Sequence, residues 1–134
     1  MESASPPMLA IAVRSIGDTT VVGVAGDVDH VVRTMLRETM AAAVARRPRA
    51  LVVDLTDVRF FGSVGLSALA GLHQTAAVAG IEVRLVATQR SVLMPLAITR
   101  VDDLFAIHPT VGDAVGHLGR PRVPGACHPG LGDG

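Results

Sequence analysis

Aromatic residues and net charge are both scarce in this chain of 134 residues. It holds three Phe and neither Trp nor Tyr, so it lacks the aromatic surface on which single-stranded nucleic acids stack. Its formal net charge is +0, which removes the basic footprint expected of a general nucleic-acid-binding protein. We therefore expect no direct nucleic-acid partner.

Cysteine and long apolar runs are scarce as well. Cys127 is the only cysteine, so no disulfide can form within the chain, which fits a reducing cytosol. No apolar run approaches the ~18 residues that a membrane-spanning helix needs. Residues 1–7 carry neither the basic segment nor the apolar segment of a secretory signal. These absences predict a cytoplasmic protein with no membrane partner.

Hydrophobic residues nevertheless make up 49% of the chain, enough for the core of one packed domain. We expect this domain over residues 8–118, between a flexible tail at 1–7 and a disordered Gly- and Pro-rich tail at 119–134. Its periodicities predict an α/β fold, a small mixed β-sheet packed against about four helices in the order β-β-α-β-α-β-α-β-α. The predicted strands are 8–13, 20–24, 51–53, 81–87 and 104–107, and the predicted helices are 30–47, 63–79, 90–98 and 110–118.

Signals at the helix ends sharpen these predictions. Gly80 should end the helix that starts near residue 63, and Thr110 should cap the last helix. In the first predicted helix, the spacing favours Met35 and Met40 as core residues. Pro95 should distort the third helix or lie in its first turn.

The stretch from residue 51 to residue 78 leads from a strand to a helix and places Ser63 at the junction. The polar run Asp54–Asp57 is expected to break the strand, and Leu69 should face the core from the helix that follows. Ser63 is positioned as an N-cap, but it is also a candidate for chemical modification. Because Gly62 and Gly65 leave the backbone uncovered on both sides, another protein could approach it closely.

The segment DLTDVRFFGSVGL, from Asp54 to Leu66, resembles the core motif of STAS domains. That motif, in the family of bacterial anti-sigma factor antagonists, is close to D-L-S-x-V-x-F-x-D-S-S-G-L. The serine that accepts phosphate in this family aligns with Ser63. Two positions depart from the pattern: Gly62 replaces the usual Asp, and Val64 stands where a second Ser or small residue is common.

Two further segments carry the same resemblance. Gly26–Asp29 is by itself typical of a polar loop after a strand, but it is similar to the family's G-E-[LV]-D signature, with Asp27 in place of Glu. In the family this acidic loop lies beside the phosphoserine loop. Residues 101–115 resemble the family's usual C-terminal pattern. The likeness therefore covers about residues 8–118.

The resemblance implies a STAS fold and a function in partner switching. The unphosphorylated domain would bind an anti-sigma factor, a serine kinase of the histidine-kinase-like ATPase fold, and phosphorylation of Ser63 would end that binding. The switch would regulate sigma-factor-dependent transcription in a stress response; a homodimer is left open. The residues implied in partner binding are Asp27, Asp29, Gly62, Ser63, Val64, Gly65 and Leu66.

The same residues allow one alternative function and argue against several kinds of catalytic or metal site. A phosphorylation-independent STAS binding module is the alternative, favoured by Gly62 and Val64. A hydrolase elbow is disfavoured because Phe61 occupies the first glycine position of Gly-x-Ser-x-Gly, and a Walker A motif fails for want of its lysine. A zinc site from His117, Cys127 and His128 lacks ligand spacing. We expect no enzyme activity, cofactor or metal.

Overall fold

The computed structural model describes residues 9–28 and 33–119 and contains the expected mixed α/β sheet. Its five strands lie in the order β1-β2-β3-β4-β5, with β1 and β2 antiparallel and the other neighbours parallel. The elements are β1 (Leu9–Ile16), β2 (Thr19–Val28), α1 (Arg33–Ala45), β3 (Ala50–Phe61), α2 (Ser63–Ala79), β4 (Glu82–Val86), α3 (Arg90–Ile98), a 3₁₀ helix (Val101–Leu104), β5 (Ala106–His108) and α4 (Val111–Gly116).

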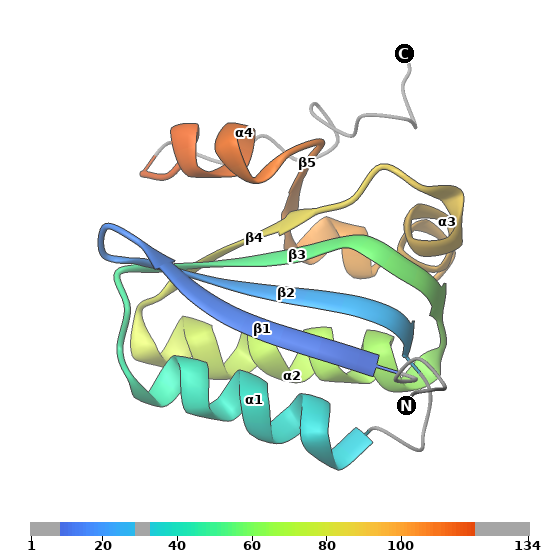
Figure 1. Ribbon diagram of the computed structural model, residues 1–134, viewed down its shortest axis with the longest axis horizontal. Helices are drawn as coiled ribbons and strands as arrows, with labels where there is room; N and C mark the ends of the chain where they lie inside the picture. The colour runs from blue at the N-terminus through green and yellow to red at the C-terminus, as the bar shows by residue number, and fades with distance from the viewer. Residues whose placement is uncertain (1–8, 29–32, 120–134) are drawn as a thin grey trace, which may run out of the picture.

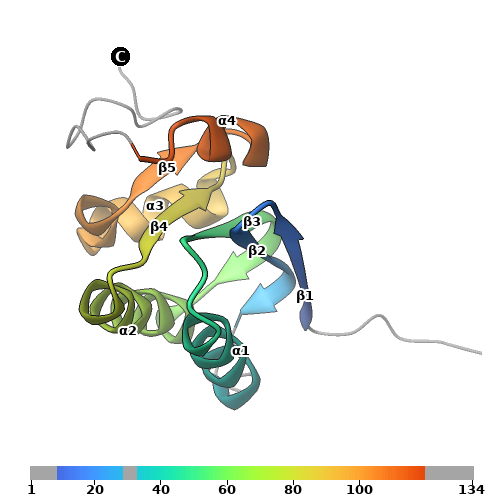
Figure 2. The same cartoon turned by 90° about the vertical axis from the view of Figure 1, so that its left-hand side faces the viewer.

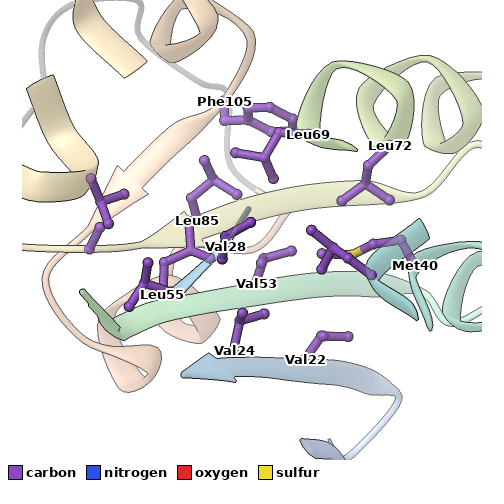
Figure 3. Close-up of a cluster of buried hydrophobic side chains, with 14 of the residues drawn as sticks. Val22, Val24, Val28, Met40, Val53, Leu55, Leu69, Leu72, Leu85 and Phe105 are labelled. Carbon is purple, nitrogen blue, oxygen red and sulfur yellow. The ribbon is translucent and has the colours of Figure 1, made fainter. Parts of the chain in front are cut away.

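The helices cover the sheet unequally. Helices α1 and α2 lie side by side on one face, whereas α4 lies on the other (Figures 1 and 2). Successive β-branched residues of the central strands point to opposite faces, so both faces are apolar. The main core, part of which is shown in Figure 3, includes Val53, Leu69 and Phe105. The smaller cluster beneath α4 consists of Val21, Val52, Val86 and Ala114.

Several local signals are confirmed. Gly80 ends α2 in the left-handed conformation, with φ 74°, and Thr110 caps α4 by accepting a hydrogen bond from the backbone N–H of Asp113 at 3.0 Å. Helix α3 has the predicted bounds. Pro95, however, lies inside α3 beyond the first turn. The predicted alternative that it lies in the first turn is therefore wrong.

The predicted break at Asp54–Asp57 is wrong, because β3 continues to Phe61. Two register shifts against β2 let this longer strand stay paired. Each shift leaves an extra residue in β3 and rotates the side chains that follow. Leu55, Val58 and Phe61 are therefore all buried although they are three residues apart. A search of the sequence for apolar and polar residues in strict alternation therefore does not detect this part of the strand.

Other boundaries also move. Strand β2 extends to Val28, so Gly26 and Asp27 lie in a strand rather than a loop. Met35 is 43% exposed, contrary to prediction, because Leu36 takes the inward position, whereas Met40 is buried as expected. Residues 29–32 and most of the two predicted tails lie outside the described residues. Within the described part, no helix is long and apolar enough to cross a membrane.

Candidate functional site

Ser63 is the first residue of α2, and Gly62 rather than Ser63 is the N-cap. The extended backbone of Gly62 donates its N–H to the carbonyl of Val28 at 3.1 Å, which joins the ends of β2 and β3. Its own carbonyl accepts from the N–H of Leu66 at 3.2 Å and so starts the helix. The prediction that Ser63 caps the helix is therefore wrong by one residue.

The side chain of Ser63 is exposed and has no structural task in the described part of the chain. Its hydroxyl makes no hydrogen bond among the described residues. A hydroxyl in this state is open to modification or to contact with another protein. Of the residues predicted around it, Gly62 is half-buried, and Asp29 lies outside the described residues.

Aromatic rings next to the two glycines define the shape of the junction. A Cβ atom on Gly65 would come within 2.5 Å of the Phe61 ring, which is 4% exposed and enclosed by the core. A Cβ atom on Gly62 would lie 2.9 Å from Cε2 of Phe60, whose side chain is 54% exposed. Gly65 is thus required by a buried ring. The Phe60 ring, by contrast, is exposed and lies next to Gly62, the residue before Ser63, although no sequence signal marked it as part of the site.

The other predicted partner-binding residues differ in how far they reach solvent. Val64 is 7% exposed, Gly65 is buried, and Leu66 is half-buried against the main core. Asp27 is accessible, and its carboxylate pairs with Arg59, with 3.4 Å between Nε and Oδ1. The exposed surface at the junction is therefore formed by Ser63 and Phe60, with the Asp27–Arg59 pair on the neighbouring strands.

Gln89 holds the irregular part of β3 in place, although no sequence signal marked it. Its side-chain amide nitrogen lies 2.7 Å from the carbonyl oxygen of Leu55, 3.1 Å from that of Thr56 and 2.8 Å from that of Val58. These carbonyls belong to the bulged segment, where the regular ladder is interrupted. The amide therefore supports the end of the strand that leads to Ser63.

A groove of about 870 Å³ begins at Ser63 and runs between α1 and α2. We call it the α1–α2 groove. Its walls include Met40, Val44 and Leu72 deeper in, and Arg33 and Arg37 near the first turns. Both helices begin at the same end of the sheet, as Figure 1 shows, so these arginines and Ser63 share one end of the groove.

A second polar cluster lies under α4. Nδ1 of His108 is 2.8 Å from Oδ2 of Asp113, and Nε2 is 3.1 Å from Nη1 of Arg84. Since a guanidinium only donates, Nε2 accepts its hydrogen bond and Nδ1–H donates to Asp113. Burial lowers the pKa of His108, Asp113 opposes this shift, and Arg84 adds to it. The Arg84 donor on Nε2 and the lowered pKa of His108 both favour the neutral imidazole.

This second cluster does not suit a metal ion. His108, Asp113 and His117 bring ligand atoms within 4.8 Å of one another. A metal on Nδ1 of His108 would move the proton to Nε2, directly against the donor of Arg84. His117 Nδ1 already bonds to the backbone carbonyl of Asp113 at 2.8 Å. The other residues of the rejected zinc set, Cys127 and His128, lie outside the described residues.

Comparison with known proteins gives consistent matches. Residues 10–114 match the STAS domain family. The anti-sigma-F factor antagonist RsfB of Mycobacterium tuberculosis is 29% identical over 111 residues, which are 83% of this chain and 90% of RsfB. The crystal structure of an anti-sigma factor antagonist from Mycobacterium paratuberculosis has 32% identity and a TM-score of 0.80, with 87% of this chain and 98% of that chain covered.

A more distant likeness extends to SpoIIAA. The unphosphorylated form of this anti-sigma factor antagonist is 17% identical with a TM-score of 0.69, covering 85% of this chain and 100% of SpoIIAA. The phosphorylated form of SpoIIAA from Bacillus is also 17% identical and has a TM-score of 0.63, with 81% of this chain and 99% of that chain covered. At this identity the likeness concerns the fold alone.

Proposed function

Because the chain belongs to the STAS domain family, as its motifs predicted, we propose that it is an anti-sigma factor antagonist switched by phosphorylation of Ser63. One observation carries the proposal. Ser63 stands at the motif position of the family's phosphoacceptor, and its hydroxyl is exposed and makes no hydrogen bond within the described chain. The similarity to two mycobacterial anti-sigma factor antagonists supports the same role.

The partner in this proposal is an anti-sigma factor that is also a serine kinase, of the histidine-kinase-like ATPase fold. Among the described residues, no basic side chain forms a hydrogen bond to Ser63, so the catalytic groups come from the kinase. The kinase transfers the γ-phosphoryl group of ATP to Oγ of Ser63 and takes up the hydroxyl proton, and ADP leaves. Binding of the unphosphorylated domain to this factor releases a sigma factor in the cytoplasm.

The phosphate affects the partner more than the fold. It adds about 1.5 to 2 negative charges at the first residue of α2, where the helix dipole favours negative charge. A partner surface matched to a neutral hydroxyl then encloses an uncompensated charge and extra volume. A loss of about 2.7 kcal/mol corresponds to ~100-fold weaker binding. SpoIIAA, which has the same fold, is known in both phosphorylated and unphosphorylated forms.

Phosphosite mapping after incubation with the cognate kinase and ATP tests the proposal. We expect one phosphate on Ser63, none in Ser63→Ala, and retained partner binding by that variant. Ser67 is the internal control, since it is exposed in the same helix but one turn further in. Phosphate on Ser67, or on no serine while binding persists, would reject the switch.

A binding module without phosphorylation is the second candidate, and one observation favours it. The Phe60 ring lies against Gly62, where the family usually has Asp, so the kinase meets an apolar ring instead of a carboxylate. In that case an intact domain binds its partner, and kinase treatment leaves the mass unchanged. Intact-mass measurement beside a binding assay separates the two functions.

A further inference from the structure

The end of the α1–α2 groove nearest Ser63 carries two arginines that the proposed function leaves unused. Arg33 is the first residue of α1, and Arg37 lies one turn further on. Both side chains are exposed, and neither has a hydrogen bond or an ion pair within the described residues. Glu38, the only acidic residue that lines the groove among the described residues, comes after both of them in α1.

This arrangement is unfavourable for α1 by itself. A positive charge in the first turn opposes the helix dipole, and the first turn of α1 contains no acidic residue to offset it. Arg33 and Arg37 are also like charges at positions i and i+4, which repel each other on a helix. A negative group at the end of the groove would remove both penalties. The described chain holds no carboxylate bonded to these side chains, but it does hold Ser63 at the same end of the groove.

We propose that Arg33 and Arg37 bind the phosphate of phosphorylated Ser63 within the same chain. The inference rests on the proposed function, since it concerns the modified form of the same serine. Helices α1 and α2 pack against each other, and packed helices have axes about 8–10 Å apart, a gap that an extended arginine side chain can cross. A phosphate offers three acceptor oxygens, which suit the forked donors of guanidinium groups.

If the arginines bind the phosphate, phosphorylation changes the charge that the end of the α1–α2 groove presents to a partner. In the unphosphorylated protein, Arg33 and Arg37 are available to carboxylates of a partner. In the phosphorylated protein they bind the phosphate, so a partner loses two cationic contacts and also meets the added group. Phosphorylation thereby acts on α1 as well as on the serine, although no residue of α1 is modified.

The test uses the full chain with phosphoserine incorporated at position 63 during translation, so that no kinase is needed. The ³¹P NMR titration of this phosphate is compared between the wild-type background and the double variant Arg33→Gln/Arg37→Gln. We expect the phosphate pKa to be lower with the arginines present, by about half a pH unit or more. Arg46→Gln is the matched control, because Arg46 follows α1 at its other end and does not line the groove.

Identical titration curves in the wild-type background and the double variant would overturn the inference. Thermal melting gives a second readout, in which phosphate raises the melting temperature of the wild-type background more than that of the double variant. Binding to the anti-sigma factor is measured separately on the same proteins. A phosphoprotein that binds as tightly as the unmodified chain refutes the proposed switch, whereas the titration and the melting comparison decide whether the arginines hold the phosphate.

Discussion

Under α4, buried polar side chains bond to one another, whereas near Ser63 the serine and two arginines are exposed without a bonded partner in the described chain. Arg84 and His108 are 5% and 4% exposed, and both bond within the cluster that links Glu82 to Asp113. At the other site Ser63 is exposed and bonds to nothing in the described chain, and the nearby Arg33 and Arg37 behave in the same way.

Burial explains this difference. A buried polar group without a partner costs its full desolvation energy, so the fold must satisfy Arg84 and His108 within itself. Exposed groups carry no such requirement, because water satisfies them. The buried cluster under α4 therefore stabilises the structure, and the exposed Ser63, Arg33 and Arg37 are available for recognition.

Removal of Glu82 should have the largest effect on stability. Its Oε2 lies 2.8 Å from both Nε and Nη2 of Arg84, whose side chain is 6% exposed. Glu82→Ala takes away the carboxylate beside a buried guanidinium, which should cost about 2–3 kcal/mol in urea denaturation.

The matched control is the ion pair near Ser63. Asp27→Ala breaks its contact with Arg59, whose side chain is 71% exposed, and should cost less than about 1 kcal/mol. If Glu82→Ala and Asp27→Ala lost the same free energy of unfolding, the distinction between the buried and the exposed ion pair would not hold.

Two glycines of α2 should respond in opposite directions. Gly65→Ala forces a methyl group against the buried ring of Phe61 and should destabilise the fold by about 1–3 kcal/mol. At Gly71 the new methyl group meets nothing within 4 Å, so Gly71→Ala should stabilise the helix by about 0.5–1 kcal/mol. Thermal or urea unfolding of both variants would show the difference, and a neutral Gly65→Ala would mean that the ring of Phe61 can move.

Local signals were sufficient for much of the fold. The end of α2 at Gly80, the cap at Thr110 and the bounds of α3 depend on residues close together in the sequence, and all three predictions are confirmed. The family motif also pointed to the strand-to-helix junction at Ser63. These features needed no knowledge of which elements pack together.

Features that depend on distant partners were not predictable. The polar run Asp54–Asp57 stays in β3 because two bulges keep the strand paired with β2 on either side of them, and because Gln89, more than thirty residues later, bonds to the strand's carbonyls. The cap at Gly62 differs from the predicted one by a single residue, which propensity cannot resolve. The shared groove of Arg33 and Ser63 exists only once α1 and α2 are packed.

Lowering the pH should reduce the stability that the cluster under α4 provides, by less than the substitutions at Glu82 and Gly65 do. Burial lowers the pKa of His108 below the ordinary 6.5, while Asp113 raises it and Arg84 and His117 lower it. The unfolded chain therefore binds the proton more readily, so this contribution to stability is complete above pH 6.5 and falls as the pH drops through the folded-state pKa.

Urea midpoints at pH 7.5 and pH 5.5 would measure the effect. The wild type should lose stability over this interval, and His108→Gln should lose less. Ser63→Ala should keep the wild-type pH dependence, since Ser63 lies outside the cluster. A wild-type protein that is more stable at the lower pH would contradict the direction given for His108.

The smallest effect on stability is expected from Ser63→Ala, and Thr110→Ala provides its counterpart. Thr110 is a true cap, whose Oγ1 accepts the N–H of Asp113 at 3.0 Å, so its loss should cost about 1 kcal/mol. Ser63 begins α2 without capping it, and alanine favours a helix more than serine does, so Ser63→Ala should lie within about 0.5 kcal/mol of wild type. Urea unfolding of both variants compares two hydroxyls at helix starts, one used by the fold and one left open. If Ser63→Ala lost as much as Thr110→Ala, the Ser63 hydroxyl would be part of the helix, and its availability for a phosphate, on which the proposed switch depends, would no longer follow from the structure.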